Sequence, residues 1–333
     1  MKIKSLIAWL ESVAPPSYQE SYDNSGLIVG NADAEITGVL CTLDSTEAIV
    51  EEAIAKGCNL IVAHHPIVFR GLKQFIGQNY VERTIIKAIK NDVAIYAVHT
   101  NLDNVYHQGV NAKIAEKLGL EHTRILAPKR ELKKLNAIVP SESVDVAMKA
   151  LQDSGATIRA EMVSSKQLEV VFHTPAQGLI LNTLRNSLKT EPVYDIAAIE
   201  NKSVEVGSGL IGILPQPMEA IDFLKHLKKT MQAACVKHTA LLGRQVQRVA
   251  VCGGAGGFLL TQAIAQQADV FVTADYKYHE FFDADGQIII ADIGHYESEQ
   301  YTIDLIYEII SHKFSNFALH CAETNTNPVQ YLC

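Results

Sequence analysis

The stretch that decides the fold is EEAIAKGCNLIVAHH, residues 51 to 65, which joins a helical segment, a polar turn and an apolar strand ending in two histidines. TQAIAQQADVFVTAD, residues 261 to 275, repeats this order, shares the Ala-Ile-Ala run and ends in an aspartate. A further strand precedes each stretch, in TGVLCTLD and QRVAVCGG, and another follows each, before HTNLD and in IIIADIGHYESE. Alternating strands and helices favour parallel sheets, whose ligands gather beyond the carboxyl ends of the strands. The sequence therefore predicts an α/β fold of two related units with mainly parallel sheets.

The segment between the two halves has a different pattern. Residues 131 to 203 predict three strands, KLNAIVP, KQLEVVFH and VYDIAAIE, separated by the helices SVDVAMKALQDSG and GLILNTLRNSL. We expect a small ferredoxin-like α+β insert here, which interrupts one domain made of residues 1 to 130 and 204 to 333. The insert contains a single histidine, His173, and no ligand cluster, so we expect the chemistry to lie outside it.

Composition narrows the class of protein. The chain has 333 residues, 48% of them hydrophobic, which predicts a globular protein with more than one domain. Its formal charge of -8 argues against extensive binding of nucleic acid. The six cysteines form no CxxC pair, which indicates reduced thiols and a cytoplasmic location. The apolar stripe at the N-terminus predicts a surface helix rather than a signal peptide, and no apolar run is long enough for a membrane span.

The adjacent histidines raise the question of a metal site. Residues 60 to 62 predict a buried strand, and Pro66 favours an extended His65, so His64 and His65 lie at the strand's carboxyl end. Successive side chains on an extended backbone point in opposite directions, which disfavours one shared ion and favours two neighbouring ions. The alternative is one histidine packed in the core and one in solvent.

Two further segments carry ligand-type side chains. HTNLD places His99 and Asp103 on a loop after a strand, and GHYESE places His295 and Glu299 on one face of a helix if that helix begins near Gly294. With His64 and His65, the set lacks thiolates and suits zinc, manganese, iron or cobalt. A bridging carboxylate would be Glu299 or Asp103. The alternatives are a solvated His–Glu pair and an ordinary hydrogen-bonded turn.

Two lesser motifs lie near these segments. VCGGAGGFLL is a glycine turn between a strand and a helix, for which a tight turn packed beside the site is favoured over an anion-binding loop. TADYKYHE places Asp275 and His279 four residues apart after a strand. We expect them to contact either the ligands or the substrate, with a surface pair as the alternative.

Taken together, several motifs resemble one known family. YDNSGLIVG, LIVAHHP, HTNLDN, CGGAGG, FVTADYKYHE and DIGHYESE occur in the order found in the Nif-three-like dinuclear metal proteins, also called GTP cyclohydrolase I type-two homologues. The resemblance covers residues 1 to 128 and 204 to 325. It implies a toroidal homohexamer, and the insert resembles the PII/CutA-like domain of longer members. It also implies two divalent metal ions per chain, zinc being favoured, on ligands that are listed here: His64, His65, Asp103, His295 and Glu299.

Two functions from different classes remain open at this point. The favoured one is a metal-dependent hydrolase that acts on a nucleotide or related small molecule, in which two ions activate water. In it, His64 and Asp103 hold one ion, His65 and His295 hold the other, and Glu299 spans both. His99, Asp275 and His279 are the catalytic candidates, the two histidines as proton carriers. The alternative is a non-catalytic metal-binding hexameric scaffold or regulatory protein, whose effector the sequence does not identify.

Overall fold

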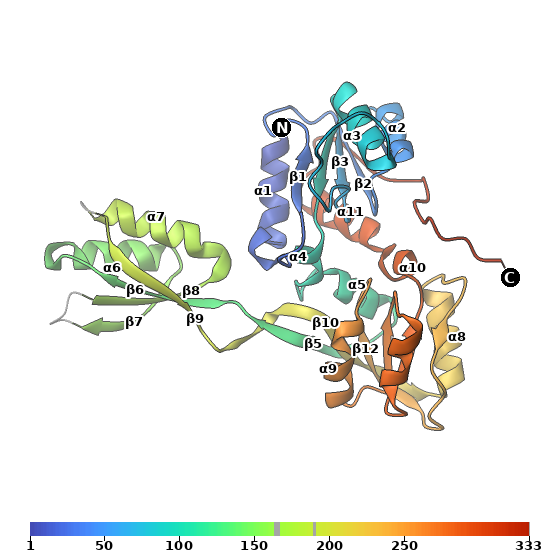
Figure 1. Cartoon of the computed structure of the whole chain (residues 1–333). Coiled ribbons are helices and arrows are strands. Elements are labelled where there is room, and N and C mark those ends of the chain that lie inside the picture. The colour runs from blue at the N-terminus through green and yellow to red at the C-terminus, as the bar shows by residue number, and fades with distance from the viewer. Residues whose placement is uncertain (163–166, 189–190, 333) are drawn as a thin grey trace. The chain divides into compact units, whose positions relative to one another are not determined.

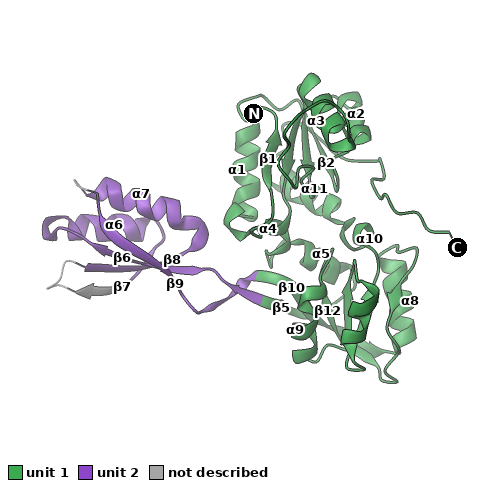
Figure 2. Ribbon diagram, in the orientation of Figure 1, with its two compact units in different colours: residues 1–127, 207–333 green, residues 128–206 purple. Residues whose placement is uncertain are grey.

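The computed structural model describes residues 1–162, 167–188 and 191–332. The chain forms two compact units, the first made of residues 1–127 and 207–333 and the second of residues 128–206 (Figure 2). The predicted insert, residues 131 to 203, falls inside the second unit.

The first half of the first unit is built on a five-stranded sheet (Figure 1). Its strands lie in the order β1-β4-β3-β2-β15, and all neighbours are parallel except β1, which is antiparallel to β4. Every residue of β2, β3 and β4 is buried, as expected for parallel strands covered on both faces. The elements are β1 (Gly26–Val29), β2 (Gly38–Thr42), α2 (Glu47–Ala55), β3 (Leu60–Ala63), α3 (Tyr80–Lys90), β4 (Ala94–Ala97) and β15 (Ala318–Cys321).

The second half repeats this arrangement on a six-stranded sheet. Its order is β11-β14-β13-β12-β10-β5, with β12, β13 and β14 parallel, β10 antiparallel to β12, and β11 antiparallel to β14. As in the first sheet, an antiparallel strand lies beside the third strand of the parallel series, which confirms the prediction of two related α/β units. The elements are β5 (Glu121–Arg130), β10 (Lys202–Met218), α8 (Ala220–Thr230), β11 (Lys237–His238), β12 (Val246–Val251), α9 (Leu260–Ala265), β13 (Val270–Thr273) and β14 (Ile289–Asp292).

One hydrophobic core joins the two sheets. Val62 and Tyr96 of the first sheet and Val249 and Val272 of the second belong to the same buried cluster. Helices α5 (Val110–Lys117) and α11 (Thr302–Lys313) contribute to this cluster, and so does the predicted N-terminal helix, α1 (Ile3–Val13). Because apolar burial contributes roughly 25 cal/mol per Å², this shared core holds the two halves as one unit.

Short helices follow the strands that lead to the predicted ligands. The HTNLD segment was expected to be a loop, but residues Thr100–Asp103 form a helical turn, α4, after β4. As predicted, a helix begins after Gly294: α10 spans His295–Glu299 and follows β14. Gly294 has φ +93°, a conformation that side chains other than hydrogen disfavour. This glycine lets the chain turn directly from a buried strand into the helix that carries two of the predicted ligands.

The second unit has its own sheet and its own core. Its strand order is β7-β8-β6-β9, and every neighbouring pair is antiparallel. The sequence predicted three strands and missed the one that follows α6, β7, whose pattern is less apolar. Leu135, Val170 and Ile180 belong to its buried core. The elements are β6 (Leu132–Ile138), α6 (Val144–Asp153), β7 (Thr157–Met162), β8 (Gln167–His173), α7 (Gln177–Ser187) and β9 (Val193–Ala198).

Among the described residues, no helix has both the length and the apolar character that a membrane span requires.

Replacing residues 131–203 with a short Gly/Ser turn should leave the metal content per chain unchanged. The three clusters of His, Asp and Glu that can hold a metal among the described residues all lie in the first unit. β5 and β10 are neighbours in one sheet, so a short turn can join them. Elemental analysis of the excised and intact proteins measures the outcome, with circular dichroism to verify folding. Loss of metal from a folded, excised protein would contradict this division of the chain.

Candidate metal centre

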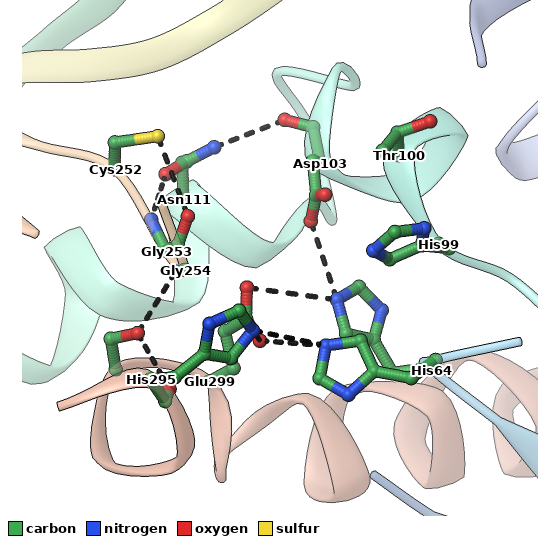
Figure 3. A network of polar contacts seen from close by, with 12 residues as sticks. His64, His99, Thr100, Asp103, Asn111, Cys252, Gly253, Gly254, His295 and Glu299 are labelled. Atoms are coloured by element: carbon green, nitrogen blue, oxygen red, sulfur yellow. Dashed lines mark hydrogen bonds and ion pairs between the residues drawn. The ribbon is translucent and has the colours of Figure 1, made fainter. Parts of the chain in front are cut away.

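The five predicted ligands come together at the carboxyl ends of strands from both sheets. Figure 3 shows four of them, His64, Asp103, His295 and Glu299. His64 and His65 follow β3, and Asp103 is the last residue of α4. His295 and Glu299 are the first and last residues of α10, one helical turn apart. Both halves of the first unit are therefore needed to build the cluster.

Glu299 is shared by two groups of ligand-type atoms, one with His64 and Asp103 and the other with His65 and His295. The atoms of each group all lie within 4.8 Å of one another. Glu299 Oε2 is 3.0 Å from His65 Nε2 and 3.1 Å from His295 Nε2. Glu299 Oε1 is 3.9 Å from His64 Nε2. Each carboxylate oxygen thus faces a different group, as a bridging ligand requires.

Two buried atoms of this cluster have no hydrogen-bond partner among the described residues. They are His64 Nε2 and Asp103 Oδ1, which lie 3.6 Å apart. An unsatisfied buried polar atom costs about 1–3 kcal/mol, so native structures seldom contain such a pair without a reason. A metal ion coordinated by both atoms would satisfy both, and the residues present therefore fit a metal.

The histidines are oriented by acceptors that lie outside the cluster. His64 Nδ1 contacts the carbonyl of Val98 at 2.9 Å, and because a carbonyl can only accept, Nδ1 carries a proton and donates it. Carboxylates hold Nδ1 of the other three rings: Asp44 at 2.8 Å from His65, Asp275 at 2.6 Å from His295, and Asp23 at 2.8 Å from His99. In each ring this leaves the Nε2 lone pair for a metal or a proton.

The cluster binds protons tightly without a metal. Burial lowers the pKa of His65, but its contacts with Asp44 and Glu299 outweigh burial and raise the pKa to about 9. For His295, burial is likewise outweighed by Glu299 and Asp275, and the pKa is about 11. Burial and the charge of Glu299 raise the pKa of Asp103 to about 7. Burial opposes ionisation of Glu299 as well, but the surrounding histidines lower its pKa.

The glycine turn after β12 lies against Glu299, as the sequence predicted. Gly254 has φ +62°, and a Cβ atom there would be 2.5 Å from Glu299 Oε1. The Gly254 amide donates to Ser298 Oγ at 2.9 Å, and the Gly253 amide donates to Asn111 Oδ1 at 3.0 Å (Figure 3). Because these amides are engaged, the turn provides close packing rather than an anion-binding loop.

The expectation that His64 and His65 point in opposite directions, which disfavoured one shared ion, is wrong. Their ring centroids are 4.8 Å apart, and their ligand atoms form a third group with that of His99. Both residues lie beyond the end of β3, where the alternation of an extended strand no longer applies. The argument for two ions therefore rests on the position of Glu299 instead.

The three catalytic candidates have different surroundings. His99 and Asp275 both line a cavity of about 740 Å³ next to the cluster. His279 does not line that cavity: it is exposed and contacts the rings of Tyr278 and Phe282. Asp275 and His279 were both expected to contact the ligands or the substrate, but only Asp275 contacts a predicted ligand, His295. Asp275 has φ +59° and lies between β13 and the helical segment Tyr278–Ala284, which carries His279.

Sequence reasoning missed two of the three carboxylates that orient the histidines, Asp44 and Asp23, whereas Asp275 was among its candidates. Asp44 follows β2 within TLDS, and Asp23 belongs to YDNSG, a motif to which no role was given. Asp44 has the same signal as the ligands, a polar residue directly after a buried strand. Asp23 has no such signal, since only the folded chain brings it to His99.

The fold and the cluster together define an α/β protein with a site of histidine and carboxylate ligands that can hold metal. The profile of the family described as Duf34/NIF3 (NGG1p interacting factor 3) matches residues 1–328, and the chain belongs to this family.

Curated and solved relatives match over the full chain. A Staphylococcus epidermidis protein named "GTP cyclohydrolase 1 type 2 homolog" is 31% identical, over 99% of this chain and 100% of its own. The structure of a Bacillus cereus protein related to NIF3 is 31% identical with a TM-score of 0.79, covering 100% of this chain and 99% of that one. A Staphylococcus aureus structure is 30% identical with a TM-score of 0.81 and the same coverage.

Glu299→Gln should remove more metal than any single histidine substitution. Glutamine keeps the size of the side chain but loses the negative charge that both groups share, whereas His64→Ala removes a ligand from the group with Asp103. We expect one metal or none in Glu299→Gln and the loss of one ion in His64→Ala, measured by elemental analysis after dialysis. If Glu299→Gln still holds two ions tightly, Glu299 does not bridge them, and Asp103 becomes the candidate bridging ligand.

Gly254→Ala should weaken metal binding, whereas Gly57→Ala should not. Both glycines have positive φ, +62° and +70°, so both alanines strain the backbone, at a cost of roughly 1–2 kcal/mol. Only at position 254 would the added Cβ displace Glu299; at Gly57 nothing lies within 4 Å. Competition with a chelator should give a loss of about 10–100-fold in metal affinity for Gly254→Ala alone. An equal loss in both variants would assign the effect to global destabilisation.

Metal binding should release protons at about pH 7.5, because ligand histidines must lose theirs. His65 and His295 have raised pKa values, about 9 and about 11, and stay protonated in the metal-free protein at that pH. The affinity for the metal should therefore rise as the pH increases from about 7.5 toward these pKa values, because fewer protons then have to be displaced. Calorimetry in two buffers of different ionisation enthalpy counts the protons; a heat of binding that is the same in both would show that the rings are already neutral.

Proposed function

We propose that the chain binds two divalent metal ions and hydrolyses a nucleotide or related small molecule. The observation that carries the proposal is the position of Glu299, whose two oxygens face separate groups of ligand-type atoms beside a cavity of about 740 Å³. Two ions so placed would lower the pKa of a bound water and polarise the bond that is attacked. The donor set, without thiolate, suits zinc first, and also iron, manganese or cobalt.

Each residue of the site has a role in this proposal. His64 and Asp103 would hold one ion, His65 and His295 would hold the other, and Glu299 would span both. His99 carries a proton at Nε2, since Asp23 engages its Nδ1. Asp275 orients His295 from the cavity wall. The name of the Staphylococcus epidermidis relative supports a nucleotide-like substrate and a ring-opening hydrolysis.

A non-catalytic metal-binding scaffold or regulatory protein is the second candidate. His99 favours it, because its ligand atom lies within 4.8 Å of those of His64 and His65. If His99 ligates a metal, protein ligands fill a coordination position that a hydrolase keeps for water or substrate.

One set of variants separates the two functions. The wild-type protein is analysed for metal and then tested on phosphoesters, amides and nucleotides with and without chelator. In a hydrolase, His99→Gln keeps both metals and loses activity, whereas in a scaffold it loses metal. His279→Gln is the matched control, since His279 is exposed and outside the cavity lining, and it should change neither quantity. Metal-loaded protein with no chelator-sensitive hydrolysis would count against the hydrolase.

We also propose a cytoplasmic homohexamer with a PII/CutA-like insert. Family membership supports the assembly, and the β-α-β-β-α-β order of the second unit supports a ferredoxin-like fold for the insert. Light scattering at micromolar concentration should give six chains per particle. A stable monomer would contradict the assembly.

A further inference from the structure

The wall of the cavity is strongly acidic. Among the described residues that line it, the single lysine or arginine is Lys237, and its Nζ lies 2.6 Å from Asp292 Oδ2. Carboxylates are numerous by comparison. Besides Asp103 and Glu299 of the metal cluster, the lining includes Glu20, Asp44, Asp275, Asp292 and Glu297.

This charge distribution disfavours a polyphosphate. Besides metal ions, sites for phosphate groups use arginine or lysine side chains, or free amides at a turn or helix N-terminus, to balance the remaining charge. Lys237 is already paired, and the amides of Gly253 and Gly254 donate to Asn111 and Ser298. Two divalent ions would add four positive charges against seven carboxylates, so the wall stays negative even when both are bound. A triphosphate would enter a cavity whose field repels it.

Aromatic rings provide the other prominent chemistry of the wall. Tyr22, Phe69 and Phe258 line the cavity, yet 70%, 54% and 66% of their surfaces are exposed. The Phe69 ring packs edge-on against His99, with centroids 5.9 Å apart, which places an aromatic surface beside the metal cluster. Exposed aromatic rings on the wall of a cavity are typical of surfaces on which planar heterocycles stack.

We infer that the substrate is an uncharged or cationic planar heterocycle of the nucleoside or free-base class, without a polyphosphate chain. The rings of the wall hold its plane, and its polar edge faces the metal cluster. The inference rests on the proposed function only in taking this cavity as the place where the substrate binds.

Binding of guanosine, GMP and magnesium GTP to the zinc-loaded protein tests the inference. We expect guanosine to bind at least tenfold more tightly than GTP at low salt, GMP to lie between them, and the gap to narrow in about 0.5 M salt as the charges are screened. Zinc content measured after each titration verifies that GTP has not removed the metal. GTP binding as tightly as guanosine, or guanosine failing to bind, would overturn the inference.

Two pairs of variants test the two parts of the inference, the repulsion of phosphate groups by the acidic wall and the stacking of the heterocycle on the aromatic rings. Glu20→Gln removes one wall charge and should improve GTP binding severalfold without changing guanosine binding, whereas Glu142→Gln, at an exposed position of the second unit, should change neither. Phe258→Ala should weaken guanosine binding about tenfold, whereas Phe75→Ala, at a ring that is also exposed but lies outside the lining, should not. Unchanged GTP binding in Glu20→Gln, or unchanged guanosine binding in Phe258→Ala, would contradict the corresponding part.

Binding and hydrolysis distinguish this inference from the proposed function. Suppose that guanosine binds most tightly, then GMP, then GTP, but that no chelator-sensitive hydrolysis is found. This result supports the proposed class of ligand and contradicts the proposal that the protein is a hydrolase. Hydrolysis of a compound that carries a triphosphate, with tight binding of that compound, overturns the ligand class and keeps the hydrolase.

Discussion

The contact of one buried carboxylate with histidines from both halves of the chain determines how the site is built. Glu299 is 3% exposed, and its oxygens face His65 and His295 on one side and His64 on the other. A carboxylate at this depth must be compensated by cations, either protonated histidines or metal ions. Three elements place these groups around Glu299. Helix α10 carries Glu299 and His295, and His64 and His65 follow β3. The turn at Gly254 has no side chain there, which leaves room for the carboxylate.

The two-sheet architecture makes this arrangement possible. Parallel strands end at one edge of a sheet, so residues that follow them collect there without any single long loop. Here the edges of two sheets meet, and one continuous hydrophobic core fixes their separation. A site built across such a core is rigid, because a shift of either half would disturb close-packed side chains such as Tyr96 and Phe223, both at most 1% exposed.

Sequence reasoning recovered what local patterns encode. Repeated helix–turn–strand segments predicted the two related units, and polar residues directly after buried strands pointed to His64, His65, Asp103, His295 and Glu299, which the fold brings together. Features that depend on contacts between distant parts of the chain could not be predicted from the sequence. Asp23 is distant in sequence from His99, and the exposure of His279 depends on how the segment after β13 turns at Asp275. The helical turn of HTNLD was missed because four residues give too short a pattern.

Part of the acidity of the cavity wall comes from the way in which the histidines are held, because Asp44 and Asp275 both line the cavity. A ligand histidine needs an acceptor at Nδ1, and the chain uses these carboxylates for His65 and His295 where a backbone carbonyl is enough for His64. Asp44 is itself held by Thr326 at 2.6 Å, so the segment after β15 takes part in fixing His65. Carboxylates bind the ring more strongly than carbonyls do and make it a better ligand, but their charge remains near the cavity. If the substrate binds in this cavity, as proposed, Asp44 and Asp275 therefore have two effects: they hold the candidate metal ligands and they disfavour anionic substrates.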